Sequence, residues 1–242
     1  MRRAYSVLVR GLLVTAPAVV FCAMFVDRPL AIFIHEHLAF FRPLRHLLDL
    51  TIIVSPLLLI YMLIYAVRRS VASTTRPAEW HWFIIATTYL VGLETKYMLK
   101  LAFGRTWPRI MWPNRYDLLL MGTLRGPDNG GLYGFYPFVS TDPFTAFPSG
   151  SSVVTVSLAT QVWFLFPRLR SLMVLLVASQ VAAGLLSNTH FVGDIIAGVY
   201  VGLVVGLYGL ALFPLRLPVP EVAPAVAASQ PAEEKAEALV TV

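Results

Sequence analysis

The chain alternates between long apolar stretches and short polar connections. Six stretches of about 16–20 residues lie at approximately Val7–Phe25, Leu50–Val67, Trp82–Leu101, Ser151–Phe166, Leu172–Ser187 and Ile195–Phe213. A helix of about 20 residues crosses a hydrocarbon core of about 30 Å. The pattern therefore predicts an all-α integral membrane bundle of about six transmembrane helices within residues 1–213.

The apolar segments near the N-terminus need separate interpretations. Arg2 and Arg3 precede the first stretch as in a signal peptide, but Asp27–Arg28–Pro29 makes a poor small-residue cleavage site. We therefore expect a retained anchor. The segment Pro29–Phe41 is apolar but too short to span a bilayer, which favours an interfacial helix.

Composition supports the membrane class. Of the 242 residues, 57% are hydrophobic and 13% are charged, whereas about 25% of the residues in a soluble domain are charged. The single Cys22 excludes a disulfide framework and a cysteine metal site. His35 and His37 flank Glu36, but no third metal ligand is placed nearby, so interfacial residues are the preferred interpretation and no metal is expected.

The net charge of +6 has a different meaning here than in a soluble basic protein. It suits cytoplasmic loops, anionic lipid headgroups or an anionic substrate. A basic stripe with interleaved aromatic residues, which would favour nucleic acid, is absent from the sequence. Membrane lipids and an anionic small molecule are therefore the expected partners.

Arginines in the short connections predict the orientation. Those at the N-terminus and after the second and fourth stretches are Arg2, Arg3, Arg10, Arg68, Arg69, Arg76, Arg168 and Arg170. The positive-inside rule, with an even number of spans, then places both termini in the cytoplasm. We expect the protein in a bacterial-type cytoplasmic (inner) membrane, with its site facing outside. Residues 214–242, rich in Pro, Ala, Val and Glu, are expected to form a disordered cytoplasmic tail.

One outer loop, residues 104–147, is unusually long. Connections of this length in compact domains are mostly functional or disordered. Its aromatic residues, Trp107, Trp112, Tyr116, Tyr133, Phe135 and Tyr136, argue against disorder. They favour a cap at the headgroup level, with the tryptophans as interfacial anchors.

A histidine and an aspartate open the sixth stretch. His190 and Asp194 are four residues apart, so they share one helix face. The carboxylate can hold one imidazole nitrogen and leave the other free for chemistry. The alternative is a buried polar pair that only ties two helices together.

Two further clusters fall on the same predicted side. Lys96, Lys100 and Arg105 close the third stretch, where lysines four residues apart would favour an anion between them. At the start of the fourth stretch, Pro148 and Ser149–Ser152 predict a helix N-terminus, which is a ready site for phosphate. Lysine, arginine, a helix N-terminus and a carboxylate-held histidine together indicate phosphoryl transfer through a phosphohistidine.

These motifs resemble those of the type 2 phosphatidic acid phosphatase superfamily, which includes vanadium haloperoxidases. The family pattern is Lys, six residues and Arg-Pro; then Pro-Ser-Gly-His; then Ser-Arg, five residues, His, three residues and Asp. Lys100, Pro148–Gly150, His190 and Asp194 match it. The departures are Trp107 at the first arginine, Ser151 at the motif histidine, and Ala183–Gly184 at Ser-Arg.

The resemblance implies a six-span lipid phosphatase or phosphotransferase that acts at the outer face without a metal or other cofactor. His190 would be the nucleophile and Asp194 its orienting carboxylate, while Lys100, Ser149 and the Gly150 amide would bind phosphate. We add Arg105 and Ser151 to the predicted phosphate ligands. Further substitutes for the absent arginines are Arg109, Arg115, Arg125, Asn188 and Thr189.

The replaced motif histidine favours a particular substrate and leaves alternatives open. Without a general acid, a phosphate leaving group departs more readily than an alkoxide, so a lipid diphosphate is expected to react faster than a lipid phosphate monoester. The alternatives are a non-catalytic lipid-phosphate binder or transporter, and a transferase of phosphorylated headgroups.

Overall fold

The computed structural model describes residues 2–71, 77–113, 131–139 and 141–212. Within these residues the chain is helical apart from its connections and one isolated antiparallel bridge between Arg105 and Phe135. Residues 114–130 of the predicted outer loop, which include Arg115 and Arg125, lie outside the described residues. So does the predicted tail at 214–242.

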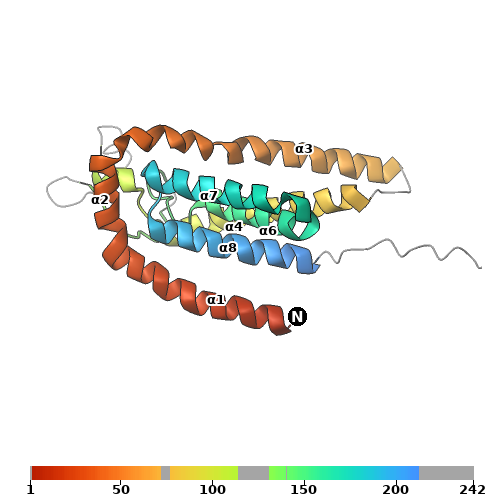
Figure 1. The fold of residues 1–242 in the computed structure, drawn as a ribbon, viewed down its shortest axis with the longest axis horizontal. Coiled ribbons are helices and arrows are strands. Elements are labelled where there is room, and N and C mark those ends of the chain that lie inside the picture. Colours follow the sequence, from red (N-terminus) through yellow and green to blue (C-terminus); the bar gives the residue numbers. More distant parts are fainter. Residues whose placement is uncertain (1, 72–76, 114–130, 140, 213–242) are drawn as a thin grey trace, which may run out of the picture.

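Six long helices run side by side (Figure 1). They are α1 (Arg2–Phe21), α3 (Leu50–Val71), α4 (Pro77–Phe103), α6 (Gly150–Leu165), α7 (Arg170–Leu186) and α8 (Val192–Leu212). Each contains most of one predicted apolar stretch, so the prediction of an all-helical membrane bundle is confirmed.

Four segments of the described chain are both long and apolar enough to cross a bilayer. These are Leu8–His37, Ile53–Val71, Pro167–Leu186 and Val192–Ala211. The helix Gly150–Leu165 is apolar but shorter. α4 is long, but Glu94, Lys96 and Lys100 lie in its second half and reduce its apolar character. The second half of α4 is therefore more polar than its first half.

Short helical elements close one end of the bundle. A π-helical turn, η1 (Cys22–Val26), joins α1 to α2 (Asp27–His37), and such turns are a common cause of helix bends. Figure 1 shows α2 lying across the end of the long helices. The 3₁₀ helix η2 (Ala39–Leu47) then leads into α3, so the predicted interfacial helix at Pro29–Phe41 is divided between α2 and η2.

α6 occupies the centre of the bundle, and small residues let α8 approach it. Val153, Val154, Ser157 and Gln161 of α6 are fully buried. A Cβ atom at Gly198 would lie 2.6 Å from the carbonyl oxygen of Ser149, and one at Gly202 would lie 2.6 Å from that of Val153. Close packing at small residues is typical of membrane helix pairs. Here it brings the first turns of α6 and α8 together at the end crossed by α2.

Two shorter 3₁₀ helices complete the described elements. η3 (Pro108–Met111) follows α4 at the end that α2 crosses, and η5 (Pro167–Leu169) joins α6 to α7 at the opposite end. Figure 1 shows the N-terminus at that opposite end as well.

Candidate functional site

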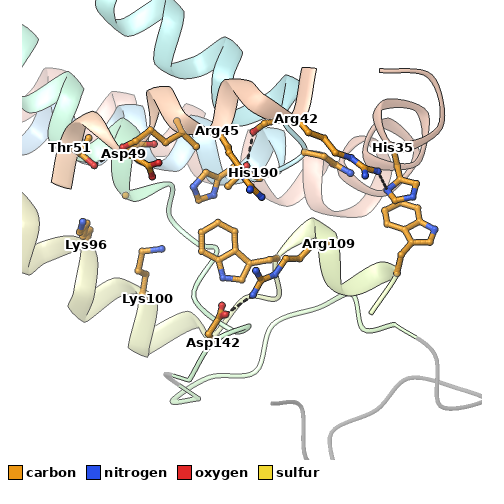
Figure 2. Close-up of a pocket in the computed structure, with 18 residues that line it drawn as sticks. His35, Arg42, Arg45, Asp49, Thr51, Lys96, Lys100, Arg109, Asp142 and His190 are labelled. Atoms are coloured by element: carbon orange, nitrogen blue, oxygen red, sulfur yellow. Dashed lines mark hydrogen bonds and ion pairs between the residues drawn. The ribbon is translucent and has the colours of Figure 1, made fainter. Parts of the chain in front are cut away.

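A cavity of about 700 Å³ opens where α2, α4, α6 and the α7–α8 junction meet (Figure 2). Four of the sequence-predicted site residues line it, namely Lys100, Gly150, Ser151 and His190. They come from three chain segments that are far apart in sequence, so the fold brings these segments to one place. Asn188 and Thr189, considered as substitutes for absent arginines, also line this cavity.

His190 is held in the turn between α7 and α8. Its backbone N–H donates to the carbonyl oxygen of Gly184 at 3.0 Å, and Asn188 turns the chain with a φ of 56°, a left-handed conformation that asparagine tolerates better than most residues. The imidazole is 5% exposed, and its Nδ1 lies 3.7 Å from Oδ2 of Asp194. Nδ1 is therefore the ring nitrogen that faces the carboxylate.

The charge state of His190 follows from its surroundings. Burial lowers the pKa of the imidazole below its ordinary value, while the Asp194 carboxylate acts in the opposite direction. Burial has the larger effect, so the side chain is neutral at neutral pH. A neutral imidazole has the lone pair that a nucleophile requires.

Asp194 belongs to a buried ion network that sequence reasoning missed. Its Oδ2 accepts a hydrogen bond from the Phe191 N–H at 3.0 Å, and its Oδ1 accepts one from Nη1 of Arg105 at 2.7 Å. Nη2 of Arg105 donates to Asp27 at 2.7 Å, and the other Asp27 oxygen accepts from the Gly193 N–H at 3.1 Å. The side chains of Asp27, Arg105 and Asp194 are completely buried.

This network gives Arg105 partners other than the predicted phosphate. Arg105 was expected to bind phosphate, but it does not line the His190 cavity, and both of its terminal nitrogens donate to carboxylates. One terminal nitrogen of the guanidinium therefore positions Asp194, and the other terminal nitrogen donates to Asp27. Arg105 thus affects His190 indirectly, through Asp194.

Ser149 is also placed behind the cavity. Its N–H donates to the backbone carbonyl of Asp194 at 2.9 Å, and its hydroxyl accepts a hydrogen bond from the Ser152 hydroxyl at 3.0 Å. The residue is buried and does not line the cavity, and its contact with phosphate stays a prediction. Gly150 and Ser151, which follow it, do face the cavity at the electropositive start of α6.

Trp107 joins the lysine and histidine sides of the site. Lys100 Nζ lies 5.2 Å from the centre of a Trp107 ring, and the His190 ring centre is 4.8 Å from that side chain. The indole N–H donates to the Thr145 hydroxyl at 3.1 Å, while Lys100 donates to the Thr145 carbonyl. Trp107 and Trp112 line the cavity, which is a role beyond the interfacial anchoring predicted for the loop tryptophans.

Two cavity arginines were not found by sequence reasoning. Arg42 and Arg45 extend from η2 and line the same cavity as His190. Their segment, FFRPLRHLL, follows the predicted interfacial helix, where arginines are expected to contact headgroups. The available signal was the pair of arginines three residues apart on a short helical turn. Arg109 also lines the cavity, but it pairs with Asp142 at 2.5 Å.

Gly150→Ala provides a test of whether the α4 lysines and the α6 N-terminus share one anion. A Cβ atom at Gly150 would lie 2.9 Å from Cδ of Lys96 and 3.4 Å from Cε of Lys100. Because these atoms belong to flexible side chains, the lysines can shift and the thermal midpoint should change little. We expect the affinity for inorganic phosphate, measured by calorimetry, to fall about tenfold, as when one charge-assisted contact is lost.

The matched control is Gly92→Ala. The nearest atoms to a Cβ there lie at 3.6–3.8 Å, an ordinary contact distance, and Gly92 does not line the cavity. Phosphate affinity should stay unchanged in this variant. Equal affinities for the Gly150→Ala and Gly92→Ala variants would show that the start of α6 takes no part in anion binding.

Comparison with known protein families identifies the family of the chain from the part that carries Lys100 and His190. A family model described as the PAP2 superfamily matches residues 80–217, more than half of the chain. The matched region contains Lys100, His190 and Asp194, whereas Asp27 and the η2 arginines precede it. Comparisons with curated proteins and with solved structures found no match.

Proposed function

Because the chain belongs to the PAP2 superfamily, whose members include phosphatases, we propose that it is a membrane phosphatase or phosphotransferase for a lipid phosphate or diphosphate. The reaction would pass through a phosphohistidine at His190. The observation that carries this proposal is the shared cavity, which places a buried imidazole, with a carboxylate oxygen 3.7 Å from its Nδ1, beside Lys96, Lys100 and the first turn of α6.

The proposed reaction has two balanced steps. Nε2 of His190 attacks phosphorus in line with the leaving oxygen, so that a P–N bond forms as the P–O bond breaks and the leaving group takes the electron pair. Water, or an acceptor hydroxyl, then attacks the phosphohistidine and loses its proton to solvent, while the P–N electron pair returns to the imidazole. Lys96, Lys100 and the α6 amides stabilise the negative charge on the phosphoryl oxygens.

The fold supports action at the outer membrane face. The end of α3, the start of α4 and the connection α6–α7 lie at the end of the bundle opposite α2 (Figure 1). Arg68, Arg168 and Arg170 are in or beside these short connections, which the positive-inside rule assigns to the cytoplasm. The cavity would then face the outside, at the depth of the lipid headgroups.

Ser151 provides a prediction about the leaving group. It lines the cavity at the position of the family histidine, and a serine hydroxyl is a poor general acid. General acids contribute about 10²–10⁴-fold when an alkoxide must leave, but a phosphate leaving group needs little protonation. We therefore expect phosphate release from a polyprenyl diphosphate to exceed that from a phosphatidic acid by at least about tenfold.

Ser151→His is the matched variant for this prediction. It should raise the rate of phosphatidic acid hydrolysis more than the rate of polyprenyl diphosphate hydrolysis. The ratio of the diphosphate rate to the phosphatidic acid rate should therefore fall. Faster turnover of phosphatidic acid by the unaltered protein would contradict the expected preference.

A lipid panel tests the proposed function itself. The purified full chain is incubated with lipid phosphates and diphosphates, with and without acceptor lipids, and both free phosphate and product lipids are measured. Phosphate release supports a hydrolase, and transfer to an acceptor lipid supports a transferase. Binding of these lipids without any turnover would refute catalysis and favour the non-catalytic binder.

A further inference from the structure

The cavity carries a second group of cations, on the wall opposite the α4 lysines. Figure 2 shows Lys96 and Lys100 rising from α4, and Arg42 and Arg45 reaching in from the connection between α2 and α3. We propose, resting on the proposed function above, that Arg42 and Arg45 bind the second phosphate of a lipid diphosphate whose reacting phosphate lies against His190. They would thus determine substrate specificity.

The charges of these arginines are available to a ligand. Among the residues that the structure describes, neither arginine has a carboxylate partner within salt-bridge distance. Nη2 of Arg42 lies 3.4 Å from Nδ1 of His35, which can accept a hydrogen bond without neutralising the guanidinium. Two acidic side chains also lie in the cavity wall: Asp142 forms an ion pair with Arg109, and Asp49 lies within hydrogen-bond distance of His46.

The segment that carries the arginines is fixed to the bundle. The carbonyl oxygen of Leu47, at the end of η2, accepts a hydrogen bond from the side chain of Gln180 in α7 at 2.7 Å. In α2, the ring of His35 stacks on Trp112 with 3.9 Å between ring centres, and the carbonyl of Ala31 accepts a hydrogen bond from Asn188 at 3.3 Å. These contacts hold the C-terminal end of η2 and the helix that precedes it, and so place the backbone of Arg42 and Arg45 beside the cavity.

The dimensions and charge of the cavity fit two linked phosphates better than one. A volume of about 700 Å³ lies in the range of sites for drug-sized ligands, well above the need of one phosphate. The reacting phosphate would occupy the space among His190, the α4 lysines and the start of α6. A diphosphate continues toward the opposite wall, where guanidinium groups can hold its oxygens in pairs. A lipid phosphate monoester has no second phosphate to bind at the wall formed by Arg42 and Arg45.

Binding of inorganic anions tests the second site without any need for turnover. The full chain in detergent is titrated with inorganic pyrophosphate and with inorganic phosphate. We expect the Arg42→Gln/Arg45→Gln double variant to bind pyrophosphate at least about tenfold more weakly, because charge-assisted hydrogen bonds are lost, while its phosphate affinity changes less than about threefold. Equal weakening for both anions, or for neither, would overturn the proposal.

A matched control removes two positive charges from the far end of the bundle. Arg68 is exposed and pairs with the half-buried Glu79, and Arg168 is exposed in η5. The Arg68→Gln/Arg168→Gln variant should therefore bind both anions like the unaltered protein. Arg42→Lys/Arg45→Lys, which retains the charge and loses the paired donors, should recover part of the pyrophosphate affinity. No recovery, together with a lowered thermal midpoint, would indicate a structural role instead.

Kinetics separate this proposal from the proposed function. For the Arg42→Gln/Arg45→Gln variant we expect KM for a polyprenyl diphosphate to rise at least about tenfold, with KM for the corresponding monophosphate nearly unchanged. If the unaltered protein turns over neither lipid but binds pyrophosphate through these arginines, the phosphatase proposal fails and the second anion site stands. If it turns over both lipids and the variant keeps their KM ratio, the arginine proposal fails alone.

Discussion

His190→Ala is expected to lower phosphate release by at least about 10³-fold, because the variant lacks the atom that forms the covalent bond to phosphorus. The fold should persist, since Asp194 keeps its hydrogen bonds to Arg105 and to the Phe191 amide when the imidazole is removed. Rates with a polyprenyl diphosphate, measured beside the thermal midpoint, check both statements.

His81→Ala is the matched control for this loss. His81 begins the apolar part of α4 at the end of the bundle opposite the cavity, where its ring packs edge-on against Phe166. The control should retain nearly the full rate. An activity of His190→Ala within about tenfold of the unaltered protein would remove the nucleophile from the proposed reaction.

Arg105→Gln should be among the most destabilising single substitutions in this chain. It leaves Asp27 and Asp194 buried without a countercharge, and breaking a buried ion pair from one side costs about 3–5 kcal/mol of unfolding free energy. We expect a clear loss of folded protein in a denaturant titration, together with loss of activity, because the carboxylate behind His190 is no longer held.

Two further variants show whether buried charge causes that loss. Asp27→Asn introduced with Arg105→Gln should recover part of the stability, because one of the two unpaired carboxylates is removed. Arg68→Gln breaks the pair between an exposed arginine and the half-buried Glu79 and should cost about 1 kcal/mol. If Arg105→Gln costs no more than Arg68→Gln, the buried network does not hold the site together.

The helices and part of the cavity could be predicted because their signals are local. Apolar stretches of nearly spanning length leave few alternatives to helices in lipid, and the spacing of Lys100, Gly150, Ser151 and His190 marked residues that the fold does bring to one cavity. Adjacent helix ends were enough to place these side chains together.

The partners of Arg105 could not be predicted, because its contacts are distant in sequence. Asp27 lies 78 positions before Arg105, in a segment that reads as the polar end of the first span. The bend at η1 is what turns this aspartate toward the start of α8. The placement of Ser149 could not be predicted for a related reason. The local sequence predicts a free helix N-terminus, but the close approach of α8 buries the Ser149 side chain.

Trapping the covalent intermediate tests the central claim most directly. The purified protein is mixed with a polyprenyl diphosphate, quenched within milliseconds at alkaline pH, where a phosphohistidine survives, and digested for mass spectrometry. We predict one phosphoryl group on His190, formed in the unaltered protein and in His81→Ala. A steady release of phosphate with no label at residue 190, or with the label on another side chain, would contradict the mechanism.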